Sequence, residues 1–436
     1  MLKRIFDLEG HGTTLRTELF AGLTTFLTMA YIVVVNPLIL GDAGMPVAGV
    51  AAATCLAAGF GSILMGLLSN YPLALAPGMG LNAYFTYTVV KGMGLPWQVA
   101  LGCVFISGIA FLLLTLAGVR QLIMSAVPRS LLAAVSGGIG LFIAFIGLKD
   151  AGVIVANPGT TVGLGKLTGA TPALAMLGLL VIAALQARAV KGAILIGILT
   201  VAIIAWVFGL ASFTPATYHL ADLSSTAFRL DVPAALNLRG GVGLSLIEIV
   251  FVFLFVDMFD NVGTLMAVTK RAGFVAADGT VPRMNRILLT DSISMLVGAL
   301  AGTSPVTSYI ESTAGVAVGG RTGLTSVTVG VLFLGTLFVA PFVQAIPAVA
   351  TAPALILVGA MMMGALAEVD WLDPVEGIPA FLTAIMVPLS YSIANGLAFG
   401  IVSHAVLKLV RGQARMGDWL VYVLAVLCVV RFAYLT

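Results

Sequence analysis

Charged side chains are scarce in this sequence. Only 9% of its 436 residues are Asp, Glu, Lys or Arg, against 60% hydrophobic residues, and the mean hydropathy is +1.13. A soluble protein of this length exposes far more charge, so the shortage excludes that class and predicts an all-α polytopic membrane protein. The formal net charge is only +3 and no basic run occurs. We therefore expect no nucleic acid among the partners.

Cysteine is also scarce. The chain has three, Cys55, Cys103 and Cys428, each in an apolar stretch without a Cys-x-x-Cys pair or a nearby histidine. Such thiols behave as small buried hydrophobes, so we expect neither a disulfide framework nor a metal site. A Walker A sequence, a His-Glu-x-x-His motif and a Gly-x-Ser-x-Gly elbow are missing as well. These absences argue against an enzyme and against a bound cofactor.

Long apolar segments make up most of the chain. About fourteen can be marked against a hydrocarbon core of about 30 Å. They run approximately over residues 19–40, 47–69, 73–91, 96–118, 129–149, 171–187, 191–210, 245–269, 284–302, 304–319, 325–346, 351–367, 377–391 and 392–410. The first run is too long for a signal-peptide core and has no cleavage site, so it predicts a first span. A further apolar helix is expected at 419–435.

Lysine and arginine gather on one side of the predicted membrane. With a cytoplasmic N-terminus, the inside loops hold Arg120, Arg129, Arg188, Lys191, Lys270, Arg271, Arg283, Arg286, Arg321, Lys408, Arg411 and Arg415. The outside loops hold Lys91, Lys149, Lys166, Arg229 and Arg239, the last two in a long polar loop. This bias follows the positive-inside rule. It predicts a multi-pass protein of the inner (cytoplasmic) membrane.

The segments fall into two groups of seven that match in kind. An odd number turns the second group upside down relative to the first, which predicts a 7+7 inverted repeat. The third segment of each group is abnormal: residues 71–87 contain Pro77-Gly-Met-Gly80, and residues 303–320 contain Pro305, several hydroxyl side chains and Glu311. Broken backbone survives at membrane depth only inside protein or beside a cavity. Paired interruptions of this kind indicate a binding site at the repeat interface.

Carboxylates inside predicted spans are the strongest candidates for function. Asp257 lies near the middle of the eighth span, and helical spacing puts Asp260 and Asn261 on its face. A carboxylate at the bilayer centre costs about 3 kcal/mol or more, so it normally faces the interior and marks a pathway or proton relay. The alternative is that Asp257 or Asp260 braces a neighbouring helix through hydrogen bonds.

Glu311 is a further carboxylate, at the start of a predicted half-helix. Free backbone N–H groups there favour polar ligand atoms, although the side chain could simply cap the helix. Its counterpart in the first group is Asn82, which offers both a donor and an acceptor. Gly78 and Gly80 precede it and allow tight turns. We predict that Glu311, Asn82 and Gly80 belong to a substrate site.

The first span adds hydroxyl and aromatic side chains. Thr25 and Thr28 share a face, and Phe26 or Tyr31 could stack against a flat ligand. Hydroxyls in spans usually bond back to their own helix, which is the alternative for both threonines.

The remaining ionisable residues suggest structural roles. Glu248 and Asp291 are expected nearer span ends, where they pair at the interface, and His404 is expected to pack. An acidic cluster in a cytoplasmic connection, expected to be solvated, comprises Glu368, Asp370, Asp373 and Glu376.

Without a nucleotide-binding motif, transport would be driven by an ion gradient or by the gradient of the substrate itself. Protons are the economical coupling ion for carboxylates near the midplane, because burial perturbs their protonation. Asp257, Glu311 and Asp260 are the candidates for proton coupling.

Three motifs carry a resemblance to a known family. Asn-Ala-Tyr-Phe (82–85), Phe-Val-Asp-Met-Phe-Asp-Asn-Val-Gly-Thr (255–264) and Thr-Ser-Pro-Val-Thr-Ser-Tyr-Ile-Glu-Ser-Thr-Ala-Gly-Val (303–316) resemble the adenine/guanine/hypoxanthine permeases. These form a branch of the nucleobase–ascorbate transporter superfamily. The resemblance covers essentially the whole chain, although the segment after Arg415 lies outside the fourteen-span pattern.

The resemblance implies a fold and a mechanism. It implies a core domain (residues 1–118 and 241–346) and a gate domain (residues 119–240 and 347–436), with short strands in the third and tenth spans. Family members are proton-coupled purine symporters thought to work by an elevator movement of core against gate. They often form dimers, so a homodimer is an implied partner beside the purine base, protons and membrane lipid.

The resemblance also implies roles for single residues. Glu311 and Asp257 would bind the base, with Asn261 one turn further on and Asn82 supporting the site from the other repeat. Ser308 and Tyr309 lie in the third motif and are predicted to contact substrate, as are Thr25 and Phe26 of the first span. Some relatives have His where this chain has Asn261, which leaves Asp257 or Glu311 as the proton carrier.

Two other readings stay open. The same fold could carry xanthine, uracil or an inorganic anion, although Asp257 and Glu311 would repel an anion. A channel, or a receptor that binds without transport, is the other class. Accumulation against a gradient would separate a coupled transporter from both.

Overall fold

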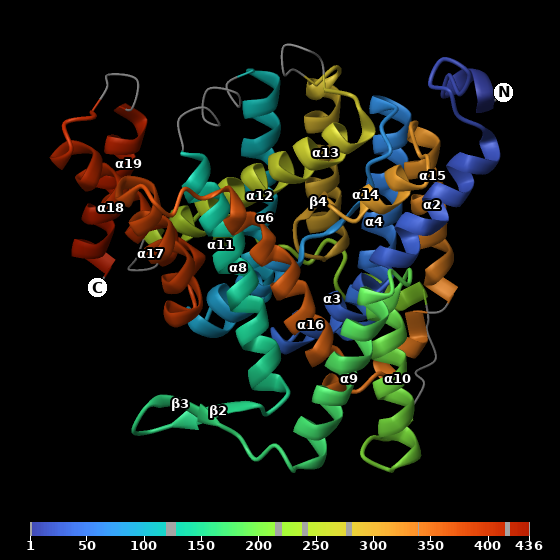
Figure 1. The fold of residues 1–436 in the computed structure, drawn as a ribbon, viewed down its shortest axis with the longest axis horizontal. Coiled ribbons are helices and arrows are strands. Elements are labelled where there is room, and N and C mark those ends of the chain that lie inside the picture. The colour runs from blue at the N-terminus through green and yellow to red at the C-terminus, as the bar shows by residue number, and fades with distance from the viewer. Residues whose placement is uncertain are drawn as a thin grey trace. The chain divides into compact units, whose positions relative to one another are not determined.

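The computed structural model describes residues 2–118, 128–213, 220–237, 243–275, 281–338, 340–414 and 419–435. These residues are mainly helical, with two pairs of short antiparallel strands. The chain divides into two compact units, each made of two separate stretches (Figure 1). Unit 1 contains residues 1–116 and 165–354, and unit 2 contains residues 117–164 and 355–436.

Unit 1 holds both interrupted segments. Its first stretch comprises α1 (Leu2–Ile5), α2 (Leu15–Met29), α3 (Ile32–Asp42), α4 (Val47–Ser69), β1 (Leu75–Pro77), α5 (Met79–Ala83), the π-helix η1 (Tyr84–Gly92) and α6 (Trp97–Leu116). Its second comprises α9 (Ala170–Ala187), α10 (Ala193–Val207), η2 (Leu220–Ser225), α11 (Val232–Ala235), α12 (Gly243–Ala272), α13 (Met284–Ala301), β4 (Val306–Ser308), α14 (Ser312–Ala317), α15 (Gly323–Gly335), η3 (Thr336–Phe338) and η4 (Ala340–Ala345).

Unit 2 is smaller. The helix α16 (Ala348–Met362) crosses the boundary between the units. The elements of unit 2 are α8 (Arg129–Asp150), β2 (Ile154–Asn157), β3 (Thr161–Leu164), η5 (Met363–Glu368), α17 (Pro374–Ser390), α18 (Ile393–Val410) and α19 (Trp419–Leu435). The β2–β3 hairpin follows α8 and projects from its end (Figure 1).

Most of the apolar segments marked in the sequence correspond to helices of the structure, whereas the segments at 73–91 and 304–319 each contain a short strand. The helix α4 covers the predicted residues 47–69, and α8 extends one residue beyond the predicted 129–149. Nine helices of the described residues are long and apolar enough to cross a membrane, and four apolar helices are shorter. The complete fourteen-span inverted repeat stays a prediction.

Both abnormal segments are broken as the sequence indicated, and they pair with each other. Strands β1 and β4 run antiparallel, with Leu75 opposite Ser308 and Pro77 opposite Val306. The pairing continues at both ends, where the Gly78 N–H donates to the Pro305 carbonyl (2.8 Å) and the Tyr309 N–H donates to the Ala74 carbonyl (3.0 Å). Two segments more than 200 residues apart therefore form one element.

Helices α4 and α15 pack against each other through glycines spaced seven residues apart. Gly59 lies against Gly330, and Gly66 lies against Gly323. A methyl group on Gly330 would come within 2.6 Å of the Gly59 carbonyl oxygen. Small residues allow such close approach between helices in apolar surroundings.

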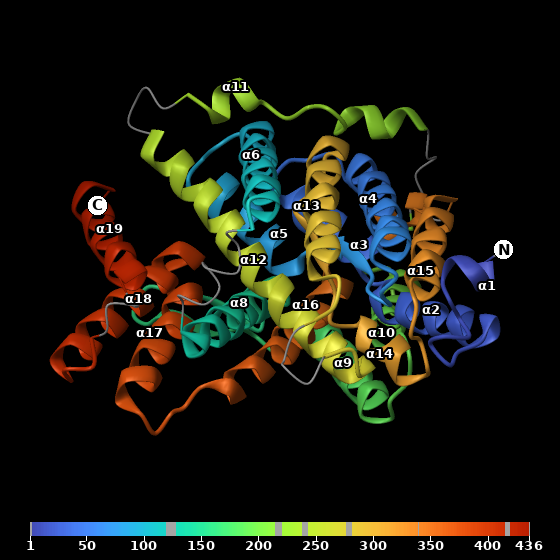
Figure 2. The ribbon, with the colours of Figure 1, turned by 90° about the horizontal axis from the view of Figure 1, so that it is seen from above.

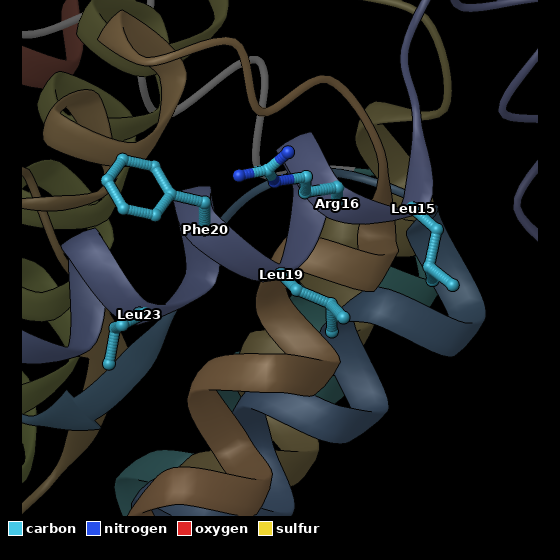
Figure 3. A pocket seen from close by; sticks show the side chains of 5 residues that line it. All are labelled: Leu15, Arg16, Leu19, Phe20 and Leu23. Carbon is cyan, nitrogen blue, oxygen red and sulfur yellow. The ribbon is translucent and has the colours of Figure 1, made fainter.

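Helix α2 has two contrasting faces. Glu18, Ala21 and Thr25 are buried against the rest of unit 1. The opposite face carries a shallow apolar surface hollow, lined by Leu15, Arg16, Leu19, Phe20 and Leu23 (Figure 3). Leucines four residues apart share a face of a helix, and an exposed apolar stripe on a spanning helix suits contact with lipid hydrocarbon.

The polar stretch before α12 packs along the edge of unit 1. In Figure 2 the elements η2 and α11 run past the ends of α13 and α6. Backbone hydrogen bonds fix them there, from Phe228 N–H to the Leu300 carbonyl (2.8 Å) and from Asp231 N–H to the Gln98 carbonyl (2.9 Å). The predicted residues His219 and Arg239 of this loop lie outside the described part.

In unit 2, α17 packs between α8 and α18. His404 of α18 is buried and its Nδ1 donates to the Val375 carbonyl (3.0 Å), which fits the expected packing role. The extra C-terminal helix α19 lies against α18, where Arg431 donates to the Asn395 side-chain oxygen (2.9 Å).

The two units divide the chain differently from the predicted core and gate, mainly at residues 165–240 and 347–354. Residues 165–240 were expected in the gate, but the structure groups them with unit 1. Helix α10 packs against α2, and Pro353 and Val201 both approach Gly178 of α9. The assignment of moving and fixed parts stays a prediction.

Candidate functional site

The β1–β4 pair is the scaffold of the candidate site. Each strand leads directly into a short helix, β1 into α5 and β4 into α14. The pair is fully buried, and Tyr309 closes its end by donating its hydroxyl proton to the Pro77 carbonyl. The half-helices that carry Asn82 and Glu311 are therefore held by the same two strands.

Glu311 immediately precedes α14 and is partly buried. Its Oε1 accepts a hydrogen bond from the hydroxyl of Tyr31 (3.0 Å), which lies in the break between α2 and α3. Tyr31 was expected to stack on a ligand, and the structure gives its hydroxyl this second role. Four residues beyond Glu311, Gly315 packs directly on the Thr25 hydroxyl of α2.

Helix α12 contributes the other acidic side chains. Asp257 and Asn261 are completely buried, whereas Asp260 is partly exposed. The helix packs against α5, β4 and α14, the elements that carry Asn82 and Glu311. Asp260 lies three residues after Asp257 in the same helix. The structure thus brings the three predicted carboxylates to one part of unit 1.

Asn82 lies in α5 and is completely buried. Its Nδ2 donates to the side-chain oxygen of Asn36 (2.9 Å) and approaches the sulfur of Met79 (3.4 Å). Gly80 is in the same short helix and Gly78 precedes it. Asn36 comes from the first span, so the two elements are linked by their amides.

Several buried polar atoms around these elements have no hydrogen-bond partner among the described residues. They are the hydroxyl oxygens of Thr25 and Thr307, the side-chain oxygen of Asn82, and both polar atoms of the Asn261 amide. Leaving a buried donor or acceptor unpaired costs about 1–3 kcal/mol. Native proteins keep few such groups, and a ligand or water that satisfies them is the usual explanation.

The other predicted residues make contacts of their own. The Ser308 hydroxyl points to Asp291 of α13, with 3.5 Å between the oxygens. The Phe26 ring packs edge-on against Phe333 of α15, with 5.2 Å between centroids. Thr28 bonds back to the Thr25 carbonyl (2.7 Å), which is the local bonding expected as the alternative.

Asp291 was expected at a span end, and that expectation is wrong. It is the eighth residue of α13 and is completely buried. Its neighbours Thr290, Ser292 and Ser294 are buried too, and their hydroxyls bond back to carbonyls of the same helix. The polar run therefore lies in the middle of α13.

Two further buried polar residues, Asn36 and Glu18, were not predicted from the sequence. Asn36 links the first span to Thr54 and Thr303, and its place within an apolar run directly before Pro37 was the available signal. Glu18 accepts from the backbone N–H of Arg321 (2.9 Å) and from the hydroxyl of Thr325 (2.6 Å). It thereby fixes the start of α15 on α2.

Comparisons with known proteins identify the family of this chain. A family model described as "Permease family" matches residues 16–399. Adenine permease AdeP of Escherichia coli (strain K12) is 46% identical over 435 residues, which cover 100% of this chain and 96% of that protein. Guanine/hypoxanthine permease PbuO of Bacillus subtilis (strain 168) is 42% identical over 428 residues, covering 97% of this chain and 98% of that protein.

Solved structures with the same fold belong to other transporters. The transmembrane domain of a cyanobacterium bicarbonate transporter, BicA, matches with a TM-score of 0.63 at 15% identity, covering 88% of this chain and 97% of that chain. The murine Slc26a9 anion transporter in its inward-facing state matches with a TM-score of 0.62 at 13% identity, covering 92% of this chain and 69% of that chain. At such identities the likeness concerns the fold alone. The family match, the full-length relatives and the apolar helices together show that this chain is a multi-pass membrane transporter of the permease family, related to adenine and guanine/hypoxanthine permeases.

Proposed function

We propose that this protein is a proton-coupled symporter of the purine nucleobases adenine, guanine and hypoxanthine. The substrate class rests on one observation, the 46% identity to an adenine permease over the whole chain, with guanine/hypoxanthine permeases at 41–42%. Relatives of both kinds are similar along essentially their full length, so the proposal names the class and not one base.

The chemistry of the candidate site supports a purine. A purine has N–H donors and ring-nitrogen acceptors around the edge of a flat apolar ring. Carboxylates at Asp257 and Glu311 accept from such donors, and the amides of Asn82 and Asn261 supply further polar atoms. Pockets for small ligands combine a few placed polar groups with apolar and aromatic surroundings, which Phe26 and Tyr309 provide.

Coupling to protons is proposed for the same carboxylates. A carboxylate that binds the base in one protonation state and releases it in the other would link the two movements. Ionisable residues inside membrane proteins commonly serve as proton relays. Glu311, Asp257 and Asp260 are the candidates, and the hydrogen bond from the Tyr31 hydroxyl holds the Glu311 carboxylate in place.

The transport movement, the membrane location and the oligomeric state are part of the same proposal. We infer alternating access of the elevator type, with the strand pair carrying the base in the moving part. The protein would lie in the inner (cytoplasmic) membrane with a cytoplasmic N-terminus, in contact with lipid along the exposed face of α2. A homodimer would give the fixed part a stable anchor.

Uptake in cells tests the substrate class. Cells that lack their own purine transport, given this chain, should take up labelled adenine, guanine or hypoxanthine at acidic external pH. The same cells without the chain are the control. Absence of uptake of all three bases by a correctly inserted protein would overturn the proposal.

An anion substrate is the second candidate, because the solved structures with this fold include bicarbonate and anion transporters. The buried carboxylates argue against it, since they would repel a further negative charge. Competition by bicarbonate or sulfate against bound adenine would favour the anion. Binding of adenine that is unchanged by either ion would favour the base.

A further inference from the structure

We propose that a chain of hydrogen bonds from Thr54 through Asn36 fixes the amide of Asn82 as an acceptor, so that the substrate is bound there through one of its N–H groups. This inference rests on the proposed function, because it treats the site as one for a nucleobase. It states that Asn82 accepts, and does not donate, the hydrogen bond to the substrate, and it names the residues that fix this direction. Asn36 and Thr54 are positioning residues in this account.

The series of hydrogen bonds begins at the Thr54 hydroxyl, which already donates its proton within α4. The Oγ1 of Thr54 lies 2.7 Å from the carbonyl oxygen of Val50 in the preceding turn of α4. Two oxygens at this distance need a proton between them, since otherwise their lone pairs repel. The Val50 carbonyl has no proton to give, so Thr54 donates. Towards Asn36 the Thr54 oxygen is then only an acceptor.

This fixes the orientation of the Asn36 amide. The atom of Asn36 that lies 2.8 Å from Thr54 Oγ1 has to be the donor, Nδ2. The same nitrogen lies 2.9 Å from Thr303 Oγ1. The oxygen of Asn36 therefore faces the other way, towards Ser304 (3.2 Å) and Asn82 (2.9 Å). Oxygen and nitrogen of an amide are assigned from such networks.

The orientation passes on to Asn82. Because Asn36 presents an oxygen, the facing atom of Asn82 has to be Nδ2. A second contact agrees, since Nδ2 also approaches the Met79 sulfur (3.4 Å), and a thioether can only accept. Both N–H protons of Asn82 are thus directed at the protein.

The oxygen of Asn82 is what remains for a ligand. It is completely buried and has no partner among the described residues. A buried acceptor needs a donor, and the edge of a nucleobase offers ring and exocyclic N–H groups. The Thr54–Asn36 pair would therefore favour bases that place an N–H at this point over bases that place an acceptor there.

Thr54→Val tests the inference without touching the site. Valine has nearly the shape of threonine but accepts no hydrogen bond, so Nδ2 of Asn36 loses one partner. Thr303 and Ser304 can each donate or accept, so Asn36 becomes free to turn over. Only the weak contact with the Met79 sulfur then still favours the original orientation of Asn82. Asn82 could then present its N–H to the substrate.

The measurement is the binding of a ligand series to purified full-length protein. The series contains adenine and its analogues in which each N–H is methylated in turn. In the wild-type protein, methylation of one N–H should weaken binding about tenfold or more, as expected when a buried acceptor loses its donor. In Thr54→Val this loss should fall to about threefold or less. A purely steric effect of the methyl group would stay the same in both proteins.

Thr115→Val is the matched control. Thr115 is also buried in a helix of unit 1 and its hydroxyl bonds back to the Phe111 carbonyl (2.8 Å), but it lies outside the Asn36 chain. It should show the wild-type profile. Asn36→Leu should lose the N–H preference as Thr54→Val does, which covers the case in which one variant fails to fold.

The possible results distinguish failure of the inference about Asn82 from failure of the proposed function. An identical profile in wild type, Thr54→Val and Asn36→Leu would overturn the inference while leaving purine binding intact. A wild-type protein that binds none of adenine, guanine and hypoxanthine would overturn the proposed function, and the inference with it. Loss of the N–H preference in Thr115→Val as well would show a general packing effect and would also overturn the inference.

Discussion

Glu311 and Asp257 are the acidic side chains on which the proposed proton coupling depends. Glu311 accepts from Tyr31 at the start of α14, and Asp257 is buried in the middle of α12. If either carries the proton, removing its charge removes the link between the proton gradient and the base. We therefore predict that Glu311→Gln or Asp257→Asn abolishes accumulation of labelled adenine at acidic external pH.

Glu368→Gln is the control for these variants. It makes the same chemical change at an exposed position in η5, and should accumulate adenine as the wild type does. Wild-type accumulation in both Glu311→Gln and Asp257→Asn would remove these residues from the site.

Some site residues were visible in the sequence because they contrast with their surroundings. Glu311 and Asp257 stood out as carboxylates within apolar runs. Asn36 and Asp291 did not, although each is completely buried and hydrogen-bonded to a strand-forming segment or its approach. Their partners lie far away in sequence, and a single amide or carboxylate does not reveal which distant groups it will meet.

The β1–β4 pair is the element that unites the two halves of the site. Backbone hydrogen bonds join residues 74 to 309 and 78 to 305, and in an antiparallel pair hydrogen-bonded and non-hydrogen-bonded positions alternate. Leu75 and Ser308 therefore form a non-bonded pair, in which the side chains are closest. We predict that Leu75→Cys with Ser308→Cys forms a disulfide on mild oxidation.

The matched control moves the second cysteine by one residue, from position 308 to position 307. In Leu75→Cys with Thr307→Cys the two side chains point to opposite faces, so no cross-link should form. The measurement is the mobility of the protein after proteolytic cleavage between the two cysteines, in a background without Cys55, Cys103 and Cys428. Cross-linking of the shifted pair alone would contradict the observed register.

The close contact between α4 and α15 at their glycines leads to a second prediction, which concerns stability. A methyl group on Gly330 would come within 3.0 Å of backbone atoms of Gly59 and Ile63. We expect Gly330→Ala to destabilise the protein by about 1–3 kcal/mol, which is typical of overpacking. Thermal unfolding of the purified protein should show a lower midpoint.

Gly335→Ala provides the comparison within the same helix. A methyl group there meets no atom of the described residues within 4 Å beyond its own stretch of helix. Gly335 ends α15 and Gly330 lies in its interior, so Gly330→Ala should gain at least as much helix propensity as Gly335→Ala. A lower midpoint for Gly330→Ala therefore reports the contact with α4. Equal midpoints for the two variants would contradict close packing of α4 on α15.

The bounds of several helices could be predicted from the sequence more closely than the contacts between elements. Apolar length predicted α4 and α8 nearly to the residue, because crossing a hydrocarbon core sets the length of a span. Pro77 and Pro305 marked the interruptions. The register of β1 on β4 could not be predicted, because it depends on how two distant segments meet.

At the scale of the whole molecule, the division into core and gate stays a prediction, because a grouping by contacts does not show which parts move. The sequence suggested a gate that included residues 165–240, whereas these residues pack with unit 1. Helix α10 of this stretch packs against α2 of the first stretch, although the two helices lie far apart in the sequence. The family was predictable because its motifs are local, and it is confirmed by the match over residues 16–399.

The central claim is that the movement of protons drives the accumulation of a purine base. It is tested most directly with purified protein in sealed liposomes, with labelled adenine outside and an imposed pH gradient, acidic outside. The account predicts that adenine rises inside above its external concentration and that a protonophore collapses this excess. Adenine that only equilibrates, to the same level with and without the gradient, would contradict the account.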